Sequence, residues 1–502
     1  MTDTLGAAAV RRWFEQGLRA MLAVRRRVDA LNVFPVPDED TGTNLVLTLA
    51  GAARAAGSLP AEADLPALTA AAARGALVGA RGNSGVILSQ AMRGLARASA
   101  GHEQLDGPAL AQALTAAAED ARRAVDRPVA GTILTVADAA AQAARSAGDQ
   151  DLAGVTRAAV DAATAALAET RSQLPVLAER GVVDAGAAGY VILLEALLSV
   201  IGDQRPASSR ARESLAELWA TPRPAAAGPS CALGPSVVGA AEDGHGAPAY
   251  EVMYVLRARP AQAARLRDHL RTVGDSVAVV GGSETTDRPG LWQVHVHTAD
   301  PAAALAGPAM EQVCIRSLSA PPLGVVATTR LPGLAGALAQ TGAVVVLHPD
   351  PAGLERGVVD AASSAVLVLA CDEPSARLAE RVPRPAGLPG GPRVSVVRAG
   401  SEVAVAAVLA ELHPGALDAE EAARVAGQVR ATECAVDELP DALVLGPADE
   451  VVTAIVGELA EDGARERAAS ALQASVQAAA PQAELIVIDG GQATPELLVG
   501  VQ

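Results

Sequence analysis

The 502-residue sequence contains no lysine, so all 40 of its basic residues are arginine. P-loop NTPases and protein kinases hold nucleotide phosphates with a lysine, and both classes are therefore excluded. A coding bias toward alanine, arginine and glycine is sufficient to explain the missing lysine. Any nucleotide chemistry in this chain must rely on metal ions, backbone N–H groups and arginine side chains.

Aromatic residues are also scarce, with two Phe, three Tyr and three Trp in the chain. These are too few for a platform on which nucleic-acid bases could stack. The formal net charge of -17 opposes binding to phosphate backbones as well. We therefore expect no nucleic-acid partner.

Signals for oxidation, export and membrane insertion are missing too. The four cysteines lie far apart and none has CxxC spacing, which is typical of reduced thiols in a cytosolic protein. The N-terminus does not combine a basic segment with an apolar one. No uncharged apolar run reaches the roughly 18 residues of a membrane span. We expect a cytoplasmic protein without a signal peptide or transmembrane segment.

The periodicity of apolar residues divides the chain into four parts, so we predict a multidomain fold. Residues 1–202 contain about eight segments with helical spacing and short glycine-bearing loops, which predicts an all-α antiparallel helical barrel. Residues 203–247 are rich in Pro, Ala and Gly and are interpreted as a linker. Residues 248–318 have the pattern of a small α+β domain, and residues 319–502 that of an α/β domain with a covered parallel sheet.

Individual elements follow from the same patterns. Two of the predicted helices cover Ala153–Leu177 and Pro301–Met310. The predicted strands of the last domain are short and rich in valine: Gly324–Thr328, Ala343–Leu347, Ala365–Ala370 and Val394–Arg398.

Four loops of the helical domain carry polar residues and glycines: residues 32–44, 79–85, 130–135 and 181–189. They follow the first, third, fifth and seventh predicted helices. Alternate loops of an up-and-down bundle lie at the same end. We therefore expect these four loops to converge on one rim of the domain.

The first loop places Asp38 and Asp40 two residues apart, just before an apolar helix. On an extended backbone such side chains point to the same side, and their charges repel unless a cation neutralises them. Oxygen ligands beside a helix N-terminus suit Mg²⁺ and phosphate together. Taken alone, however, the loop is more often an Asx-rich turn that caps a helix.

The other three loops have the same two interpretations. Arg81–Gly85 has glycines that let backbone N–H groups approach an anion, but Asn83 or Ser84 could simply cap the next helix. Gly131–Thr132 and Asp184–Gly186 could contact a nucleotide or begin a helix. Four such signals at one rim favour a metal–nucleotide site.

The motifs VFPVPDEDTGTN, ARGNSGVILSQ, GTILTVADA and VVDAGAAGYV closely resemble the ATP-binding domain of the dihydroxyacetone kinase L-subunit superfamily. Within it, the chain is most similar to the fatty acid kinase A subunit family, over nearly its whole length. The N-terminal motifs are specific, whereas the C-terminal match is loose. The resemblance implies that the helical domain binds Mg²⁺ and ATP at its rim.

By this resemblance, Asp38 and Asp40 are catalytic residues and Mg²⁺ ligands, assisted by Asn32. Relatives usually carry glycine between the two aspartates, where this chain has Glu39. That difference leaves the ligands intact but puts the turnover rate in question. The resemblance also implies nucleotide contacts for Thr41, Thr43, Asn44, Asn83, Ser84, Gly85, Thr132 and Asp184.

His295 and His297 alternate on a predicted strand, so both imidazoles share a face and could bind zinc. Taken alone, two strand histidines are more often surface residues. The resemblance implies a zinc site here with a cysteine as third ligand, at a place where this chain has Glu251. A carboxylate can also ligate zinc.

The first functional hypothesis, implied by the resemblance, is an ATP-dependent kinase subunit that phosphorylates the carboxylate of a fatty acid. A separate carrier of the DegV-like family would hold the fatty acid, and the product would be an acyl phosphate. The family also implies a homodimer, carrier docking on the C-terminal domain, and room for peripheral association with a membrane.

Two other hypotheses are kept. The second is a dihydroxyacetone-type (glycerone) kinase subunit, although such a subunit is normally a lone helical domain. The third is a non-catalytic nucleotide-sensing scaffold in which Glu39 has weakened catalysis.

Overall fold

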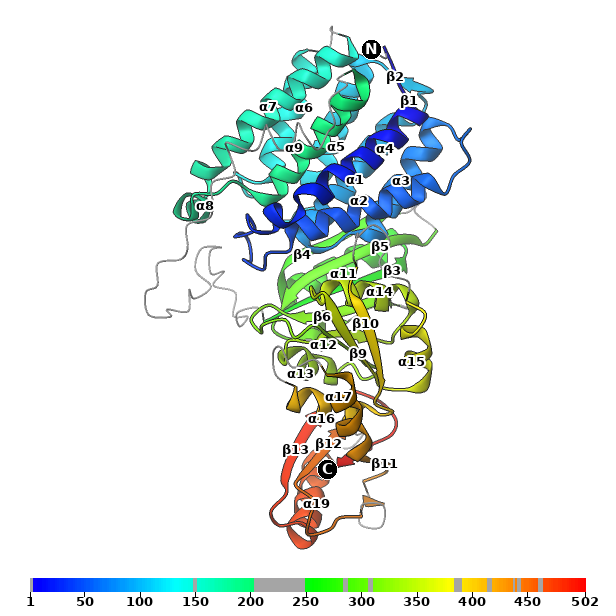
Figure 1. The fold of residues 1–502 in the computed structure, drawn as a ribbon, viewed down its shortest axis with the longest axis vertical. Helices are drawn as coiled ribbons and strands as arrows, with labels where there is room; N and C mark the ends of the chain where they lie inside the picture. Colours follow the sequence, from blue (N-terminus) through cyan, green and yellow to red (C-terminus); the bar gives the residue numbers. More distant parts are fainter. Residues whose placement is uncertain are drawn as a thin grey trace. The chain divides into compact units, whose positions relative to one another are not determined.

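The computed structural model describes residues 3–147, 151–202, 249–282, 288–305, 310–382, 391–412, 418–436, 438–439, 444–458 and 464–502. The predicted linker, residues 203–247, lies outside these ranges. The described chain has a helical N-terminal region and a sheet-rich region that follows it (Figure 1).

The N-terminal region is built from helices that pack in chain order, each from α1 to α7 against the next. Helix α9 is apolar on all sides and packs against α1, α2, α6 and α7, so it forms the centre of this region. A short strand pair joins Leu5–Gly6 (β1) to Gln104–Leu105 (β2). The helices are α1 (Ala7–Asp29), α2 (Thr41–Gly57), α3 (Leu65–Gly79), α4 (Gly82–Ser99), α5 (Gly107–Arg123), α6 (Ile133–Ser146), α7 (Leu152–Gln173), α8 (Pro175–Arg180) and α9 (Ala185–Ile201).

The structure corrects one of the predicted helices in this region. Ala153–Leu177 was expected to be continuous, but α7 ends at Gln173 and α8 begins at Pro175. Proline has no N–H to donate and its ring clashes with the preceding turn, so it is tolerated at the first position of a helix and excluded from the interior.

An eight-stranded sheet follows, in the order β10-β9-β7-β8-β6-β3-β5-β4 (Figure 1). Strands β10, β9, β7 and β8 are parallel to their neighbours within this group, which confirms the predicted parallel sheet. Strand β6 is antiparallel to both β8 and β3. The strands are β3 (Tyr250–Ala258), β4 (Gly274–Gly282), β5 (Gly290–Thr298), β6 (Met310–Ser317), β7 (Val325–Thr329), β8 (Val344–Leu347), β9 (Ala365–Ala370) and β10 (Arg393–Arg398).

A second correction concerns Pro301–Met310, which was expected to be one helix. Helix α12 covers only Pro301–Ala304, and Met310 begins strand β6. The sequence Gly307-Pro308 opposes helix continuation, and the β-branched Val313 and Ile315 favour a strand. The other helices beside this sheet are α11 (Pro260–Val273), α13 (Leu334–Gln340), α14 (Pro351–Asp360) and α15 (Glu373–Ala379).

The C-terminal residues form a four-stranded sheet in the order β11-β14-β12-β13. Its apolar core contains Val452, Val456, Leu472 and Leu497. The elements are α16 (Glu402–Glu411), α17 (Ala419–Gln428), β11 (Arg430–Cys434), β12 (Val451–Val456), α19 (Ala464–Ala479), β13 (Glu484–Asp489) and β14 (Leu497–Val501).

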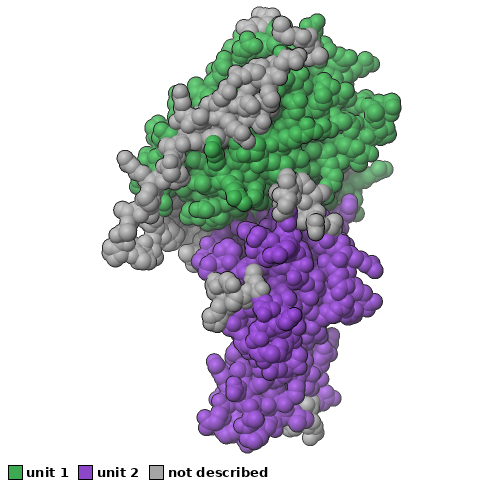
Figure 2. Space-filling view, viewed as in Figure 1, with its two compact units in different colours: residues 1–244, 258–267, 276–295 green, residues 245–257, 268–275, 296–502 purple. Residues whose placement is uncertain are grey.

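The chain divides into two compact units (Figure 2). One consists of residues 1–244, 258–267 and 276–295, and the other of residues 245–257, 268–275 and 296–502. Among the described helices, none combines the length and the apolar character that crossing a bilayer would require.

Candidate metal and nucleotide site

The loop between α1 and α2 holds its two aspartates through two asparagines. The side-chain amide of Asn32, which is buried, donates to Asp38 Oδ1. The amide of Asn44 donates to Asp40 Oδ1 over 2.7 Å. Asp38 and Asp40 are themselves partly exposed. Two oriented carboxylates at a solvent-accessible loop are a donor set that fits Mg²⁺.

Glu39, between these aspartates, is exposed and has a φ of 53°. This is the left-handed region, which glycine enters without steric cost and which costs other L-residues roughly 1 kcal/mol or more. A glycine at this position would suit the backbone, and Glu39 is strained in this conformation.

The four polar loops of the helical region meet at one end, as their alternation predicted. A Cβ placed on Gly82 would lie 2.6 Å from Asn44 Nδ2, which brings the start of α4 against the start of α2. A Cβ placed on Gly186 would lie 3.2 Å from Ser84 Oγ and 3.5 Å from Ile133 Cβ. The first turns of α2, α4, α6 and α9 are therefore neighbours.

Asp184 ties two of these helices together. Its carboxylate accepts the N–H of Ala187 over 2.8 Å and also hydrogen bonds from the backbones of Ile133 and Gly186. Burial raises the pKa of Asp184 to about 6, although the backbone hydrogen bonds act in the opposite direction. The carboxylate oxygens of Asp184 therefore accept backbone N–H groups in the first turns of both α6 and α9.

Asp29, the last residue of α1, accepts hydrogen bonds from the first turn of α2, as Asp184 does from the first turns of α6 and α9. Its carboxylate accepts both the N–H and the hydroxyl of Thr43. The donors of Thr43 are thus engaged inside the protein rather than presented to a ligand. Asp29 was not among the site residues predicted from the sequence. The feature that could have drawn attention to it is an acidic residue at the end of a predicted helix, where the helix dipole disfavours a negative charge.

Helix α4, like α2 and α6, begins without a side-chain cap hydrogen bond. Its N-cap residue, Arg81, makes no side-chain cap hydrogen bond. Helices α3, α5 and α7 begin with an aspartate whose carboxylate accepts a backbone N–H: Asp64, Asp106 and Asp151. At the rim itself, Asp29 accepts backbone N–H groups from the first turn of α2, and Asp184 accepts them from the first turns of α6 and α9. The backbone N–H groups of Gly82, Asn83 and Ser84 form a first turn that fits an anion.

Two other residues expected to contact the nucleotide have structural partners. The N–H of Gly85 donates to the Arg81 carbonyl, and a Cβ at Gly85 would lie 2.6 Å from Thr48 Oγ1, so this glycine permits close packing of α4 on α2. The Thr132 hydroxyl donates to the Val129 carbonyl over 2.9 Å. Thr41 is buried in the first turn of α2.

Glu251, His295 and His297 are buried, and their potential ligand atoms all lie within 4.8 Å of one another. Two imidazoles and a carboxylate form a donor set that zinc accepts in proteins. Arg316 Nε also donates to Glu251 Oε2, so this arginine competes with a metal for the carboxylate.

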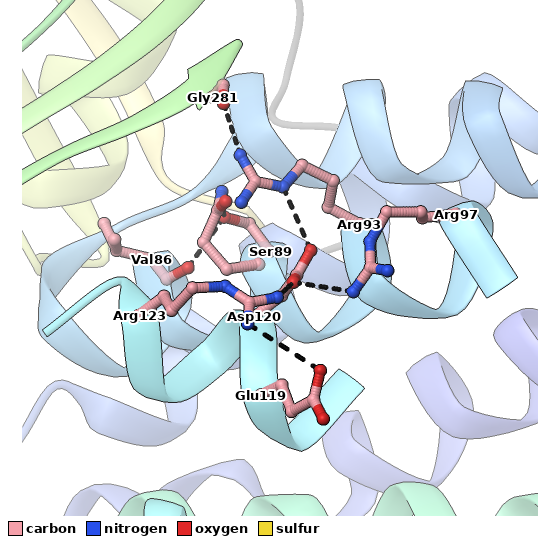
Figure 3. Close-up of polar contacts among 9 residues, drawn as sticks. Val86, Ser89, Arg93, Arg97, Glu119, Asp120, Arg123 and Gly281 are labelled. Carbon is pink, nitrogen blue, oxygen red and sulfur yellow. Dashed lines mark hydrogen bonds and ion pairs between the residues drawn. The ribbon is translucent and has the colours of Figure 1, made fainter. Parts of the chain in front are cut away.

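A separate polar network surrounds Asp120, which is buried on α5 (Figure 3). Arg93 and Arg97 approach its carboxylate to 3.3 and 3.0 Å, and Arg123 also pairs with it. Burial by itself would raise the pKa of Asp120, but the arginines lower it overall. Arg93 also donates to the Gly281 carbonyl, so the network attaches the end of β4 to α4.

Comparisons with known proteins identify families for the helical region and for the segment that follows the predicted linker. Residues 35–199 match the family model of the DAK2 domain, and residues 247–309 match that of the fatty acid kinase A subunit-like middle domain. Protein YloV of Bacillus subtilis is 48% identical over 110 residues, which is 22% of this chain and 20% of that protein. Uncharacterized proteins of Staphylococcus saprophyticus and Staphylococcus aureus are 44% and 46% identical over the same shares. The match thus spans about a fifth of the length of these curated relatives.

Proposed function

We propose that this chain, a fatty acid kinase A-like protein with a DAK2 domain and the matching middle domain, binds Mg²⁺ and ATP at the rim of its helical region. We further propose that it transfers the terminal phosphoryl group to the carboxylate of a fatty acid. The acid would be held by a separate carrier protein of the DegV-like type, and the product would be an acyl phosphate.

The observation that supports the nucleotide site most strongly is the uncapped first turn of α4 beside the Asp38–Asp40 loop. Gly82 lies against Asn44, whose side chain orients Asp40. A site for anions thus adjoins a site for a divalent cation. Because the chain has no lysine, backbone N–H groups supply the positive potential that a lysine supplies in P-loop enzymes.

The residues of this rim have distinct roles under the proposal. Asp38 and Asp40 would hold Mg²⁺, which neutralises phosphate charge during phosphoryl transfer. Asn32 and Asn44 orient the two carboxylates, and the N–H groups at the start of α4 hold phosphate oxygens. Asp184 fixes the starts of α6 and α9. Phosphoryl transfer asks the protein mainly for positioning and charge stabilisation, which this arrangement can provide.

The first prediction concerns Asp38. Asp38→Asn keeps a hydrogen-bond acceptor for Asn32 but removes the charge that attracts the metal. We expect phosphoryl transfer to fall by roughly 100-fold or more, with circular dichroism unchanged. The assay is ATP consumption by the purified chain with fatty acid and carrier. Asp64→Asn, at the start of α3, is the matched control and should retain activity.

The choice of acceptor separates the proposal from its rivals. A dihydroxyacetone-type subunit would consume ATP with dihydroxyacetone and partner subunits, but not with fatty acid and carrier. The strained Glu39 favours a third outcome, in which calorimetry shows binding of Mg²⁺ and ATP but no acceptor supports turnover. Full activity of Asp38→Asn would contradict the metal assignment in either catalytic version, and undiminished binding of Mg²⁺ and ATP by this variant would contradict it in the third.

We also propose that Glu251, His295 and His297 bind zinc. Metal analysis of the purified chain should find about one zinc per chain, and His297→Ala should lose it. Zinc-free protein with an intact Arg316–Glu251 pair would show that the arginine has replaced the metal.

A further inference from the structure

Asp29 and Thr43 form a two-point contact between α1 and α2. Asp29 Oδ1 accepts the backbone N–H of Thr43 over 2.8 Å, and Asp29 Oδ2 accepts the Thr43 hydroxyl over 3.1 Å. Because both carboxylate oxygens are used on one residue, the contact fixes orientation as well as distance. Hydrogen bonds to an ionised group are stronger than those between neutral groups.

Arg25 completes this contact from the preceding turn of α1. Its Nη1 donates to the Thr43 hydroxyl oxygen over 3.0 Å, so that hydroxyl accepts from Arg25 while it donates to Asp29. Gly42 allows the close approach: a Cβ there would lie 2.4 Å from the Arg25 carbonyl oxygen and 2.9 Å from Asp29 Oδ1. The end of α1 and the first turn of α2 are therefore held as one body.

Asp29 occupies this place against two unfavourable effects. It lies at the C-terminus of α1, where the helix dipole disfavours a negative charge. Burial also raises its pKa, although the hydrogen bonds from Thr43 and the charge of Arg25 act in the opposite direction. The hydrogen bonds that Thr43 of α2 donates to the carboxylate partly offset these two effects. A neutral residue would suffice if the position only had to end α1.

We propose that Asp29 is a positioning residue for the metal-binding loop. It fixes the first turn of α2, which carries the oxygen ligand Asp40 and its orienting partner Asn44. The Asp40 carbonyl accepts the Asn44 N–H over 2.8 Å, and the Asn44 amide holds the Asp40 carboxylate. Asp29 also closes the start of α2 to phosphate, so the phosphates are directed to α4. This inference rests on the proposed function of the same site.

The test compares Asp29→Ala with Asp106→Ala by calorimetry of Mg²⁺ and ATP binding. Asp106 is a matched control because its carboxylate accepts the Ala109 N–H over 2.9 Å at the start of α5, away from the four polar loops. Asp29→Ala removes both hydrogen bonds to Thr43, and we expect it to weaken binding of Mg²⁺ and ATP by about tenfold. Asp106→Ala should lower thermal stability similarly while leaving binding unchanged.

Two variants separate positioning from general destabilisation. Asp29→Asn keeps one acceptor for the Thr43 N–H and should recover part of the affinity. Thr43→Val removes the hydroxyl but keeps the N–H, so adding it to Asp29→Ala should cause little further loss. If Asp29→Ala binds as tightly as the unchanged protein, or if Asp106→Ala loses as much affinity, the positioning role is wrong.

Hydrogen exchange provides a readout that does not depend on nucleotide. Asp29→Ala should speed exchange of the Thr43 amide and of residues 38–44, and Asp106→Ala should not. If the unchanged protein fails to bind Mg²⁺ and ATP, the proposed function fails. The positioning of the loop by Asp29 is then still decided by exchange, and unchanged protection of residues 38–44 would overturn it.

Discussion

The aspartates of the helical region are chemically identical in the sequence, but the structure gives them different tasks. Asp38 and Asp40 accept side-chain amides at a partly exposed loop. Asp29 and Asp184 accept backbone N–H groups instead. Asp184 is buried, whereas Asp29 is partly exposed. Of these four, the first pair lies together on one partly exposed loop and is oriented by side-chain amides, which is the arrangement that a metal ligand needs.

Glu39 provides a prediction about backbone strain. Glu39→Gly and Glu39→Ala both remove the carboxylate, but only glycine adopts a φ of 53° without a Cβ clash. We expect the glycine variant to be more stable than the alanine variant by about 1 kcal/mol in urea unfolding. Its turnover should be at least that of the unchanged protein. Equal stabilities would mean that the loop relaxes around the side chain.

Asp184 makes the stability of the helical region depend on pH. Its folded-state pKa is raised from 3.8 to about 6, so the native protein keeps a proton that the unfolded chain loses between these values. The contribution of this proton to the free energy of unfolding is complete below pH 3.8 and is lost as the pH rises through 6. The shift corresponds to roughly 3 kcal/mol.

The variant Asp184→Asn keeps an acceptor for the Ala187 N–H but cannot titrate. We expect the free energy of unfolding of the unchanged protein to fall between about pH 4 and pH 7 relative to this variant. Urea unfolding at both pH values measures the difference. Parallel pH profiles for the two proteins would contradict the assignment.

At the scale of elements, small residues decide how closely the helices approach. A Cβ on Gly75 of α3 would lie 2.2 Å from the Gly51 carbonyl oxygen of α2, and no side-chain motion could relieve that contact. Helices α2 and α4, which bear the candidate site, both pack against α3. Their spacing therefore depends on this glycine pair.

Gly75→Ala should accordingly destabilise the protein by about 2 kcal/mol through overpacking. Gly57→Ala is the matched control, because Gly57 also lies in a helix but a Cβ added there would meet nothing within 4 Å. The control should be neutral or slightly stabilising, since alanine favours helix over glycine. Thermal unfolding of the two variants distinguishes packing from helix propensity.

Element prediction succeeded where the periodicity was strong and failed where local chemistry interrupted it. Strand β9 has the bounds that its uncharged run Ala365–Ala370 predicted. Pro175 divided an expected helix, and strand β6 was missed because its pairing with β3 and β8 is decided by residues distant in the sequence. Strand formation depends on such partners more than helix formation does.

At the scale of the whole molecule, composition limits the chemistry. Under the proposed function, a chain with a net charge of -17 and no lysine would have to attract a nucleoside triphosphate through local features. The start of α4 and the Asp38–Asp40 loop would be such features, and the effect of such charges and dipoles falls off over short distances. We proposed that this chain transfers the phosphoryl group while a separate carrier holds the fatty acid. The match of residues 247–309 to a fatty acid kinase A subunit-like middle domain supports that proposal.

The sequence by itself determined the helical N-terminal region, the parallel strands and the segments that carry polar chemistry, because periodicity and turn residues act locally. It also indicated that the four polar loops share one rim, since helix alternation fixes which end each loop occupies. Only the tertiary structure decided which donors are already used. Asp29 reaches Thr43 across 14 positions in the chain, and Asp184 reaches Ile133 from a different helix. Hydrogen bonds between distant segments depend on how helices pack, and local sequence patterns carry no record of that packing.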